Sequence, residues 1–321
     1  MKLDIVDKKL LYALDRNARR SIAQIAKELS AHRNVILYRV KKLEETGVIR
    51  GYFTEVDMRK LGYIIFRVFI KIGNYTLDDE KRLIEYLKNI PQLMWFFQVQ
   101  GKWDIDIVFA ARTIDEFESF LSKLLQEFNK IIEEKSISLV TQIIHYPKDY
   151  LIDKKREKVQ KKEFAQAEIK IDEKDKNILR AISERASIPL IELASQTRLS
   201  INTLKDRLRK MEKSKIILGY RPFIETEKTG YQYFKFILFF KNYTRYNIDN
   251  VRNFFEKNEK LVYLTDYVNG GDIEAEMHLE SEQEMLVLKS LLVEKFGQYI
   301  KEITTIKFYK EHLYRYLPQT L

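Results

Sequence analysis

The sequence predicts an α+β fold made of two copies of one module, each with a basic helical head and a body of strands and helices. The first observation is a repeat at a constant offset of 168 residues: Asp7-Lys8 returns as Asp175-Lys176, and Gly51-Tyr52 as Gly219-Tyr220. A solenoid repeat would have a period of roughly 20–50 residues, so this is the duplication of a whole module. One chain then carries what is usually the work of two identical subunits.

The second observation is the uneven distribution of charge. Residues 1–52 carry 12 basic and 6 acidic side chains, and residues 171–220 carry 11 and 7. The connector 151–170 adds 7 and 4, whereas residues 53–150 (13 and 15) and 221–321 (14 and 15) are slightly acidic. The whole net charge of +10 therefore lies in the heads and their connector, a distribution typical of a polyanion-binding protein.

Each head reads as three helices followed by a strand. In residues 1–52, the first helix has apolar side chains at helical spacing, and Ser21 opens the second with Gln24 as its capping-box partner. A third helix runs from Arg33 to Thr46, Gly47 closes it, and the β-rich residues 48–53 follow as a strand. This order predicts a winged helix-turn-helix domain in 1–52 and a second in 171–220.

Each body has the pattern of a ferredoxin-like βαββαβ domain. In residues 53–150 the patterns predict strands at 64–72, 93–100, 105–111 and 136–145, and helices at 78–89 and 116–132. In residues 221–321 the strands recur near 233–240, 261–268, 273–279 and 300–309. The connector 151–170 is charged and has no apolar stripe, which favours a helical spacer over a disordered one.

The composition excludes several classes of protein. A chain without cysteine has no disulfide scaffold, thiolate zinc site or cysteine nucleophile. No apolar run approaches a membrane span and the N-terminus lacks a signal-peptide core, so we expect a soluble, cytoplasmic protein. The four histidines have no metal-ligand spacing, and no phosphate loop or Ser-His-Asp candidate occurs. We expect no metal, no cofactor and no catalytic residue, with surface or capping roles for His32 and His145.

Two motifs carry a resemblance to a known family. Leu43-Glu-Glu-Thr-Gly-Val-Ile-Arg-Gly-Tyr52 after Arg39-Val-Lys-Lys, together with the Gly-x-x-Asp turn of Gly101 and Asp104, resembles the Lrp/AsnC family of transcriptional regulators. The resemblance covers essentially the entire chain, twice. It implies DNA binding by the heads, dimerisation through the bodies and often an amino-acid effector. The second copy departs from it, because Lys215 replaces the helix-closing glycine and Asn269 stands where Gly101 predicts glycine.

The third helix of the first head is the predicted recognition helix. If Ile36, Val40 and Leu43 face inward, the opposite face is free for DNA. The predicted contacts are Arg33 and Asn34 for base edges, Leu37 and Tyr38 for thymine methyl groups, and Arg39, Lys41 and Lys42 for phosphates. The alternative is a solvated basic face on an ordinary helix.

The second head keeps part of this pattern. Ser200 stands at the expected N-cap, but Asp206 replaces Tyr38 with the wrong charge for DNA, and Pro189 takes the position of Ser21. The predicted contacts are Asn202, Thr203, Lys205, Arg207, Arg209 and Lys210. We therefore expect a weaker reader with a different specificity, and a purely structural role is the alternative.

The resemblance also implies an effector site. In the resembling family, small effectors lodge between bodies near the turn that Gly101 and Asp104 mark here. Gly101, Asp104 and Asp272 are therefore the expected effector-binding residues, with a carboxylate pairing the ammonium group of an amino-acid-like ligand. The alternative is structural: Asp104 and Asp272 are turn residues, and Asp106 and Glu274 are solvent-facing acids.

The predicted function is a transcriptional regulator, not an enzyme, that reads an imperfect inverted repeat in double-stranded DNA. We expect the two bodies to pack as an intramolecular pseudo-dimer that pairs further into a homo-oligomer; pairing of each body with its counterpart on another chain is the alternative. Siroheme decarboxylase subunits are similar in build, but the strand Met94-Trp-Phe-Phe-Gln-Val-Gln100 has no histidine and the cations lie in the heads. An architectural chromatin protein would share every DNA-binding feature.

Overall fold

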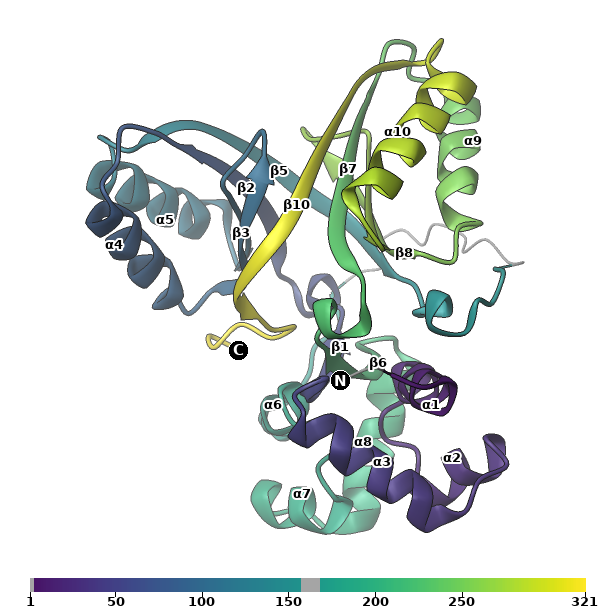
Figure 1. The fold of residues 1–321 in the computed structure, drawn as a ribbon. Helices are drawn as coiled ribbons and strands as arrows, with labels where there is room; N and C mark the ends of the chain where they lie inside the picture. Colours follow the sequence, from purple (N-terminus) through teal and green to yellow (C-terminus); the bar gives the residue numbers. More distant parts are fainter. Residues whose placement is uncertain (1–2, 157–167) are drawn as a thin grey trace.

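The computed structural model describes residues 3–156 and 168–321, so most of the predicted spacer lies outside the described residues. Figure 1 shows two helical heads at one end and a β-barrel flanked by helices above them, the predicted α+β fold. The first copy contains α1 (Ile5–Arg16), α2 (Ile22–Glu28), α3 (Arg33–Glu45), β1 (Ile49–Val56), β2 (Ile64–Ile72), α4 (Leu77–Lys88), β3 (Leu93–Gly101), β4 (Ile105–Ala111), α5 (Ile114–Glu127) and β5 (Ile132–His145). The second contains α6 (Glu173–Ser183), α7 (Leu190–Thr197), α8 (Ile201–Lys213), β6 (Ile217–Ile224), β7 (Gln232–Phe240), α9 (Arg245–Glu256), β8 (Leu261–Val268), β9 (Ile273–Leu279), α10 (Glu282–Phe296) and β10 (Ile300–Tyr314).

The eight body strands close one barrel in the order β10-β3-β4-β2-β5-β8-β9-β7. Closure depends on the last strand of each body, because β5 pairs with β8 of the second body and β10 pairs with β3 of the first. The exchange is reciprocal: Leu139 faces Val268, and the equivalent Lys307 faces Gln100. The two bodies therefore form a pseudo-dimer within one chain, and the described barrel has no free edge.

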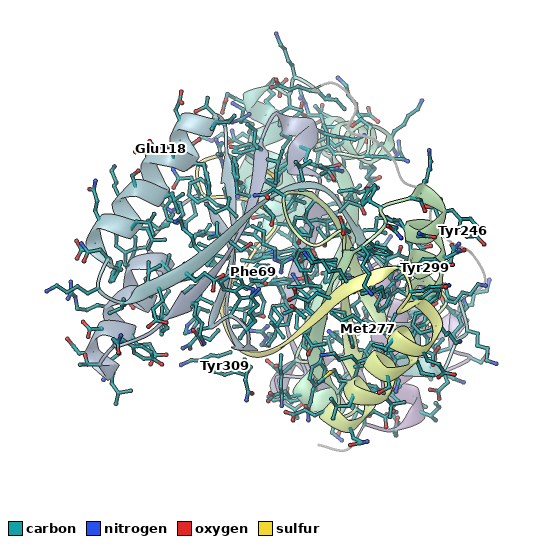
Figure 2. The ribbon with its side chains drawn as sticks, turned by 90° about the horizontal axis from the view of Figure 1, so that it is seen from above. Phe69, Glu118, Tyr246, Met277, Tyr299 and Tyr309 are labelled. Carbon is teal, nitrogen blue, oxygen red and sulfur yellow. The ribbon has the colours of Figure 1, made fainter. Side chains whose placement is uncertain are left out.

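The body helices lie on the outside of the barrel. Leu83 and Leu87 of α4 and Val251 and Phe255 of α9 are fully buried against the sheet, as their helical spacing predicts. Figure 2, which looks onto the barrel from above, shows α5 and α9 on opposite sides with Phe69 between them. The strands β4 and β9 are consequently buried along their whole length, whereas β5 and β10 keep exposed residues.

The heads are joined by a two-stranded antiparallel sheet of β1 and β6. The strand that follows each recognition helix therefore pairs with the strand of the other head. Two reciprocal hydrogen bonds reinforce the contact: Ala18 N donates to Tyr220 O (2.8 Å), and Ala186 N donates to Tyr52 O (3.0 Å). The two heads are thus held as a pair at one end of the molecule (Figure 1).

Three predicted boundaries are wrong, and tertiary pairing explains them. The helix predicted at 116–132 ends at Glu127, and the strand predicted from residue 136 begins at Ile132, because its first residues pair with the end of β2. The last strand, predicted to end near residue 309, continues to Tyr314 because it pairs with β3 of the other body. Local sequence patterns do not reveal a partner from the other copy.

The barrel contains a buried network of charges. Asp106 and Glu274, which the structural alternative placed in solvent, are each 1% exposed, so that part of the alternative is wrong. The Arg67 guanidinium lies 2.6 Å from Asp106 and 3.0 Å from Glu276, and the Lys235 ammonium lies 3.0 Å from both Glu274 and Glu276. Burial alone would raise the pKa of Glu276, but Lys235 and Arg67 lower it to about 2. All three acids thus depend on two bases inside the barrel.

A second ionic cluster joins heads and bodies. Asp15 of α1 is fully buried and lies 3.0 Å from the Lys148 ammonium, and Arg221 of β6 donates to the Asp15 carbonyl (2.9 Å) and to Glu55 (2.8 Å). His145, expected at the surface, is buried with Nδ1 3.3 Å from Glu55. That expectation is wrong because the end of β5 runs under the heads. The cluster therefore ties the two heads to the end of the first body.

The pseudo-equivalent position holds aromatic side chains instead. Offsetting Arg221, Glu55 and Lys148 by 168 residues gives Phe53, Phe223 and Tyr316. The rings of Phe53 and Tyr316 stack at 4.8 Å with an interplanar angle of 1°, and those of Phe53 and Phe223 lie 4.5 Å apart. The junction is ionic on one side of the pseudo-two-fold axis and aromatic on the other.

Removing a base from the barrel should be strongly destabilising. We expect Arg67→Met to lower the free energy of unfolding by about 3–5 kcal/mol, because Asp106 and Glu276 lose a buried partner. The matched control is Arg82→Met, which breaks the exposed pair with Glu127 and should cost less than about 1 kcal/mol. Urea denaturation measures both, and equal losses would contradict the account.

Stability should also fall at mildly acidic pH. Burial and the charge of Arg221 lower the pKa of His145 from its ordinary 6.5 to about 4. Between these values the unfolded chain binds one more proton at this site, so the free energy of unfolding falls by about 3 kcal/mol as the pH decreases from 6.5 to 4. Denaturation series over this pH window measure how steeply the free energy of unfolding changes with pH. In His145→Gln this slope should be smaller by the amount that corresponds to about one bound proton. Leu313→Gln, at the pseudo-equivalent position, should retain it; the same slope in both variants would refute the assignment.

Candidate DNA-binding heads and ligand cavities

The exposed face of α3 is the one predicted to read DNA. Ile36, Val40 and Leu43 are buried in the first head, and Tyr38 is 65% exposed. The side chains on the outer face are Arg33, Asn34, Val35, Leu37, Tyr38, Lys41 and Lys42. Sequence reasoning missed Val35, because its apolar side chain is typical of a core. The polar and basic residues just before Val35 in the sequence were the signal that it lies on an exposed face.

The N-terminus of α3 is free to approach a ligand. His32 is its N-cap, and Nδ1 accepts a hydrogen bond from Asn34 N at 3.3 Å, so its predicted capping role is confirmed. The first turn contains no acidic side chain. An uncompensated helix N-terminus carries partial positive charge, which favours a phosphate. Arg33 and Asn34 are thus in the turn with the most favourable local field.

Arg39 and Arg207 have partners within their own heads. The Arg39 guanidinium lies 2.7 Å from Asp4 and 2.6 Å from Asp7, and Arg207 repeats this with Asp172 (2.9 Å) and Asp175 (2.8 Å). Hydrogen bonds from the Asp7 backbone and from Arg39 lower the pKa of Asp4. Both arginines brace the recognition helix against the first helix, which leaves less of each guanidinium for a phosphate.

The face of α8 is exposed but less basic at its centre. Leu204, Leu208 and Met211 are buried, and Ser200 caps the helix by accepting from Thr203 N at 3.1 Å, as predicted. The remaining predicted contacts are all exposed: Asn202, Thr203, Lys205, Arg209 and Lys210. Asp206 is also exposed and lies 3.5 Å from Arg209, so it neutralises part of that charge.

The predicted effector residues occupy tight turns at the barrel end away from the heads. The Asp104 carboxylate accepts from Ile72 N (2.9 Å) and lies 3.0 Å from the Lys71 ammonium, while Asp272 accepts from Phe240 N (2.7 Å). Each aspartate thus fastens the start of one strand to the end of another. An effector would have to share these oxygens with the backbone.

Steric crowding explains why the first of these turns contains a glycine. Gly101 has φ +134°, and a Cβ there would lie 2.7 Å from the carbonyl oxygen of Thr305 in β10. In the second copy, Asn269 occupies this place with φ +59° and donates from Nδ2 to the equivalent carbonyl of Ile137 at 3.0 Å. The departure from glycine therefore replaces a close backbone approach by a hydrogen bond. A cavity of about 210 Å³ is lined by residues of both turns, including Trp103 from the first and Asn269 from the second.

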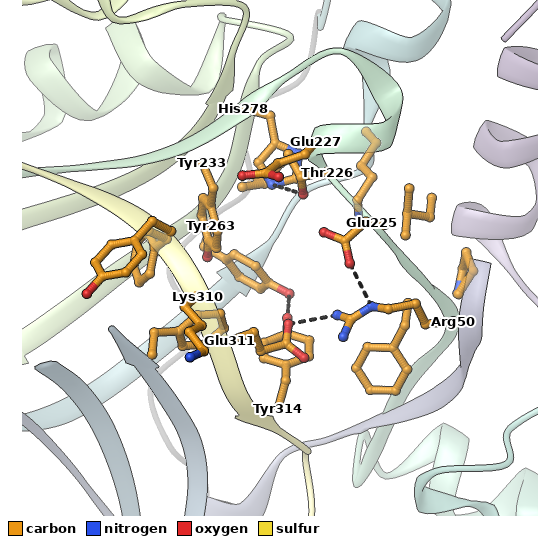
Figure 3. A pocket seen from close by; sticks show the side chains of 18 of the residues that line it. Arg50, Glu225, Thr226, Glu227, Tyr233, Tyr263, His278, Lys310, Glu311 and Tyr314 are labelled. Carbon is orange, nitrogen blue, oxygen red and sulfur yellow. Dashed lines mark hydrogen bonds and ion pairs between the residues drawn. The ribbon is translucent and has the colours of Figure 1, made fainter. Parts of the chain in front are cut away.

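Two further cavities lie where the heads meet the bodies, and they are pseudo-equivalent. The larger, of about 360 Å³, is lined by residues that include Phe223, Glu225 and Tyr263. The smaller, of about 50 Å³, is lined by residues that include Glu55 and Trp95, which precede Phe223 and Tyr263 by 168 positions. Figure 3 shows the larger one, with Arg50 between Glu225 and Glu311.

The described residues contain neither a metal-binding cluster nor a membrane-spanning helix. Within 3–156 and 168–321, no cluster of histidine, aspartate or glutamate could hold a metal ion. Over the same residues, no helix is both long enough and apolar enough to cross a bilayer.

Comparison with known proteins identifies the module. A family model described as a winged helix-turn-helix DNA-binding domain matches residues 3–50 and again 171–217. An uncharacterized HTH-type transcriptional regulator of Pyrococcus furiosus is 30% identical over 126 residues, which is 39% of this chain and 83% of that protein. The regulatory protein AsnC of Haemophilus influenzae is 30% identical over 129 residues, 40% of this chain and 85% of that protein.

Nearly the whole chain is similar to a solved structure of another activity. The crystal structure of the siroheme decarboxylase NirDL has a TM-score of 0.64 at 13% identity, covering 96% of this chain and 92% of that one. Its co-complex with an iron-uroporphyrin III analogue gives 0.65 at 12%, covering 98% and 94%. At such low identity this likeness shows a common fold alone.

The sequence relatives decide the family. At 30% identity each match covers more than four fifths of the relative and about two fifths of this chain. The helix-turn-helix match occurs in both heads, in front of each ferredoxin-like body. The chain therefore belongs to the Lrp/AsnC family of transcriptional regulators, with the unit of the family present twice in one polypeptide.

Proposed function

We propose that the protein regulates transcription by binding an imperfect inverted repeat in double-stranded DNA with its two unequal heads. The observation that carries the proposal is the exposed outer face of α3, where Arg33 and Asn34 lie in a first turn without an acidic side chain and Lys42 lies in the last turn. Arginine and asparagine are suited to guanine and adenine edges in the major groove. Pairing of the heads through β1 and β6 supports simultaneous use of two half-sites.

The two heads should not read the same bases. At the positions of Arg33 and Tyr38 the second head has Ile201 and Asp206. An arginine that can form two hydrogen bonds with guanine is thus replaced by an apolar side chain, and an aromatic ring by a carboxylate that phosphates repel. The second head is therefore the weaker and differently specific reader. An amino-acid effector at Gly101, Asp104 and Asp272 remains a prediction.

A siroheme decarboxylase activity is the second candidate, favoured by the fold of NirDL over the whole chain. A tetrapyrrole with many carboxylates needs converging cations. The larger junction cavity instead has Arg50 already paired with Glu225 and Glu311. Its pseudo-equivalent is nearly filled. Titration with siroheme separates the two functions, since a Soret shift with saturable binding would favour the enzyme.

We also propose that two chains pair into a larger assembly through α10. Leu286, Val287 and Val293 on this helix are 50–55% exposed. The first copy has Glu118 and Ser119 at the positions of Leu286 and Val287. A second copy of this chain, arranged by two-fold symmetry, would cover the apolar face.

This assembly predicts a change in mass. The double variant Leu286→Glu, Val287→Ser copies the first body and should convert dimers of the chain into monomers in light scattering, because the apolar area that drives association is lost. Lys289→Ala, on the same helix, is the control. A parent protein that stays monomeric at high micromolar concentration would remove the proposal.

Base recognition by the first head can be tested by substitution. Arg33→Ala and Asn34→Ala should each weaken binding by about 1–3 kcal/mol and relax base preference in one half-site only. Asn202→Ala should affect the other half-site. Competition binding with a site selected from random sequences measures both effects. Unchanged binding in the two α3 variants, with loss in Asn202→Ala, would reverse the ranking of the heads.

Phosphate contacts should have a different signature. Lys42→Ala should weaken all sequences alike and lower the salt dependence of binding by about one counterion. Lys81→Ala, in the body helix α4, is the matched control and should change nothing. A parent protein that binds its selected site no more tightly than random DNA would favour the architectural alternative, because specific binders discriminate by roughly 10³-fold or more.

A further inference from the structure

The two junction cavities lie at equivalent places in the two copies but have different linings. The smaller one is nearly filled, since Tyr316 occupies the place that Lys148 has in the larger, and its ring stacks on Phe53. Met58 and Ile143 likewise stand where the larger cavity has Thr226 and Glu311. About 50 Å³ leaves room for little more than water, whereas about 360 Å³ is within the range of ligand sites.

The wall of the larger cavity has an excess of negative charge around Arg50. The Arg50 guanidinium is shared by two carboxylates, Nε to Glu225 at 3.1 Å and Nη2 to Glu311 at 2.8 Å. Lys148 is paired with the buried Asp15 at 3.0 Å, so its charge is compensated. The rim adds one acid, Glu227, and one base, Lys310. The lining thus has three acids and three bases. Because Asp15, which lies outside the lining, compensates Lys148, and Arg50 has two carboxylate partners, one negative charge around Arg50 is left uncompensated.

Aromatic rings form the rest of the wall. Tyr233 and Phe308 stack at 4.2 Å, and Phe223 meets Tyr314 edge to face at 5.4 Å. Figure 3 shows Tyr233, Tyr263 and Tyr314 around the cavity, with Arg50 and Glu225 across from them. Ring faces attract cations, and most strongly where water is excluded. A cavity with aromatic walls and a surplus carboxylate is complementary to an organic cation.

One histidine at the wall adds no positive charge. Burial holds the pKa of His278 well below its ordinary value, so its ring is neutral at neutral pH. Nδ1 lies 2.7 Å from the Tyr150 hydroxyl, and Nε2 lies 3.5 Å from the Thr226 hydroxyl beside the cavity. Both ring nitrogens thus have hydroxyl partners, and the neutral ring does not attract an anion.

We propose that the larger junction cavity binds one small organic amine per chain, with its ammonium group at Glu225 and Glu311 and its apolar body against the aromatic walls. A carboxylate ligand at this place would meet Glu225 and Glu311, and the two inner bases, Arg50 and Lys148, already have acidic partners. In a zwitterion, the ammonium group would be attracted to the two glutamates, but the carboxylate group would be repelled by them. The site is separate from the effector turn of Gly101 and Asp104, and its existence does not depend on DNA binding.

Calorimetric titration of the full chain tests the proposal. The probes are 2-phenylethylamine and choline as cations, L-phenylalanine as the zwitterion and phenylacetate as the anion. We expect at least one cation to bind with a stoichiometry of one per chain, L-phenylalanine more weakly, and phenylacetate not at all. Failure of both cations to bind, tighter binding of phenylacetate, or a stoichiometry of two would overturn the proposal.

Variants copied from the filled cavity sharpen the test. Glu311→Ile introduces the residue of the smaller cavity, and should weaken the bound amine about tenfold or more because a charge-assisted contact is lost. Ile143→Val, at the equivalent position, should leave the affinity unchanged. Equal affinities in Glu311→Ile and the parent would contradict the assignment. DNA binding of the same samples is measured separately, so that loss of the ligand site leaves the proposed function standing.

Discussion

The reciprocal exchange of the last strands holds the rest of the structure in place. Without β5 on β8 and β10 on β3, each body would present an open sheet edge and an exposed layer of charges. Closure buries Arg67, Lys235 and their acidic partners in a barrel that neither body can form alone. It also fixes the ends of β5 and β10 beneath the heads, and these ends supply His145 and Tyr314 to the junction.

Because both halves are encoded separately, the pseudo-two-fold interface has been free to diverge. A symmetric homodimer must place the same residue on both sides of its axis. Here one side of the junction holds Asp15, Lys148 and Arg221, and the other holds Phe53, Phe223 and Tyr316. The ionic side requires full pairing of buried charges, and the aromatic side requires only packing. The same divergence fills one cavity and leaves the other open.

The repeated module and the outward face of α3 could be predicted from the sequence, but the barrel that the two bodies form together could not. Periodicity and the repeat predicted the order of elements, the inward face of α3 and the caps at Ser21, His32 and Ser200. It failed at Asp106 and Glu274, because a strand covered on both faces gives no alternation from which to infer the side that meets water. It missed the junction cavities, since their walls combine β1, β6 and β10, which are far apart in the chain.

The junction of heads and bodies also connects the larger cavity directly to the recognition helix of the first head. Arg50, at the cavity, belongs to the strand that follows α3, and in the same strand the Tyr52 hydroxyl donates to Glu44 of that helix at 2.7 Å. Tyr220 and Glu212 repeat this bond in the second head, where Leu218 replaces Arg50. The strand-to-helix link is thus common to both heads, and only the first carries a side chain that reaches into an open cavity. A change in the position of Arg50 would reach α3 through its own strand and α8 only through the pairing of β1 with β6. The first head is therefore the one that a ligand in this cavity would affect most directly.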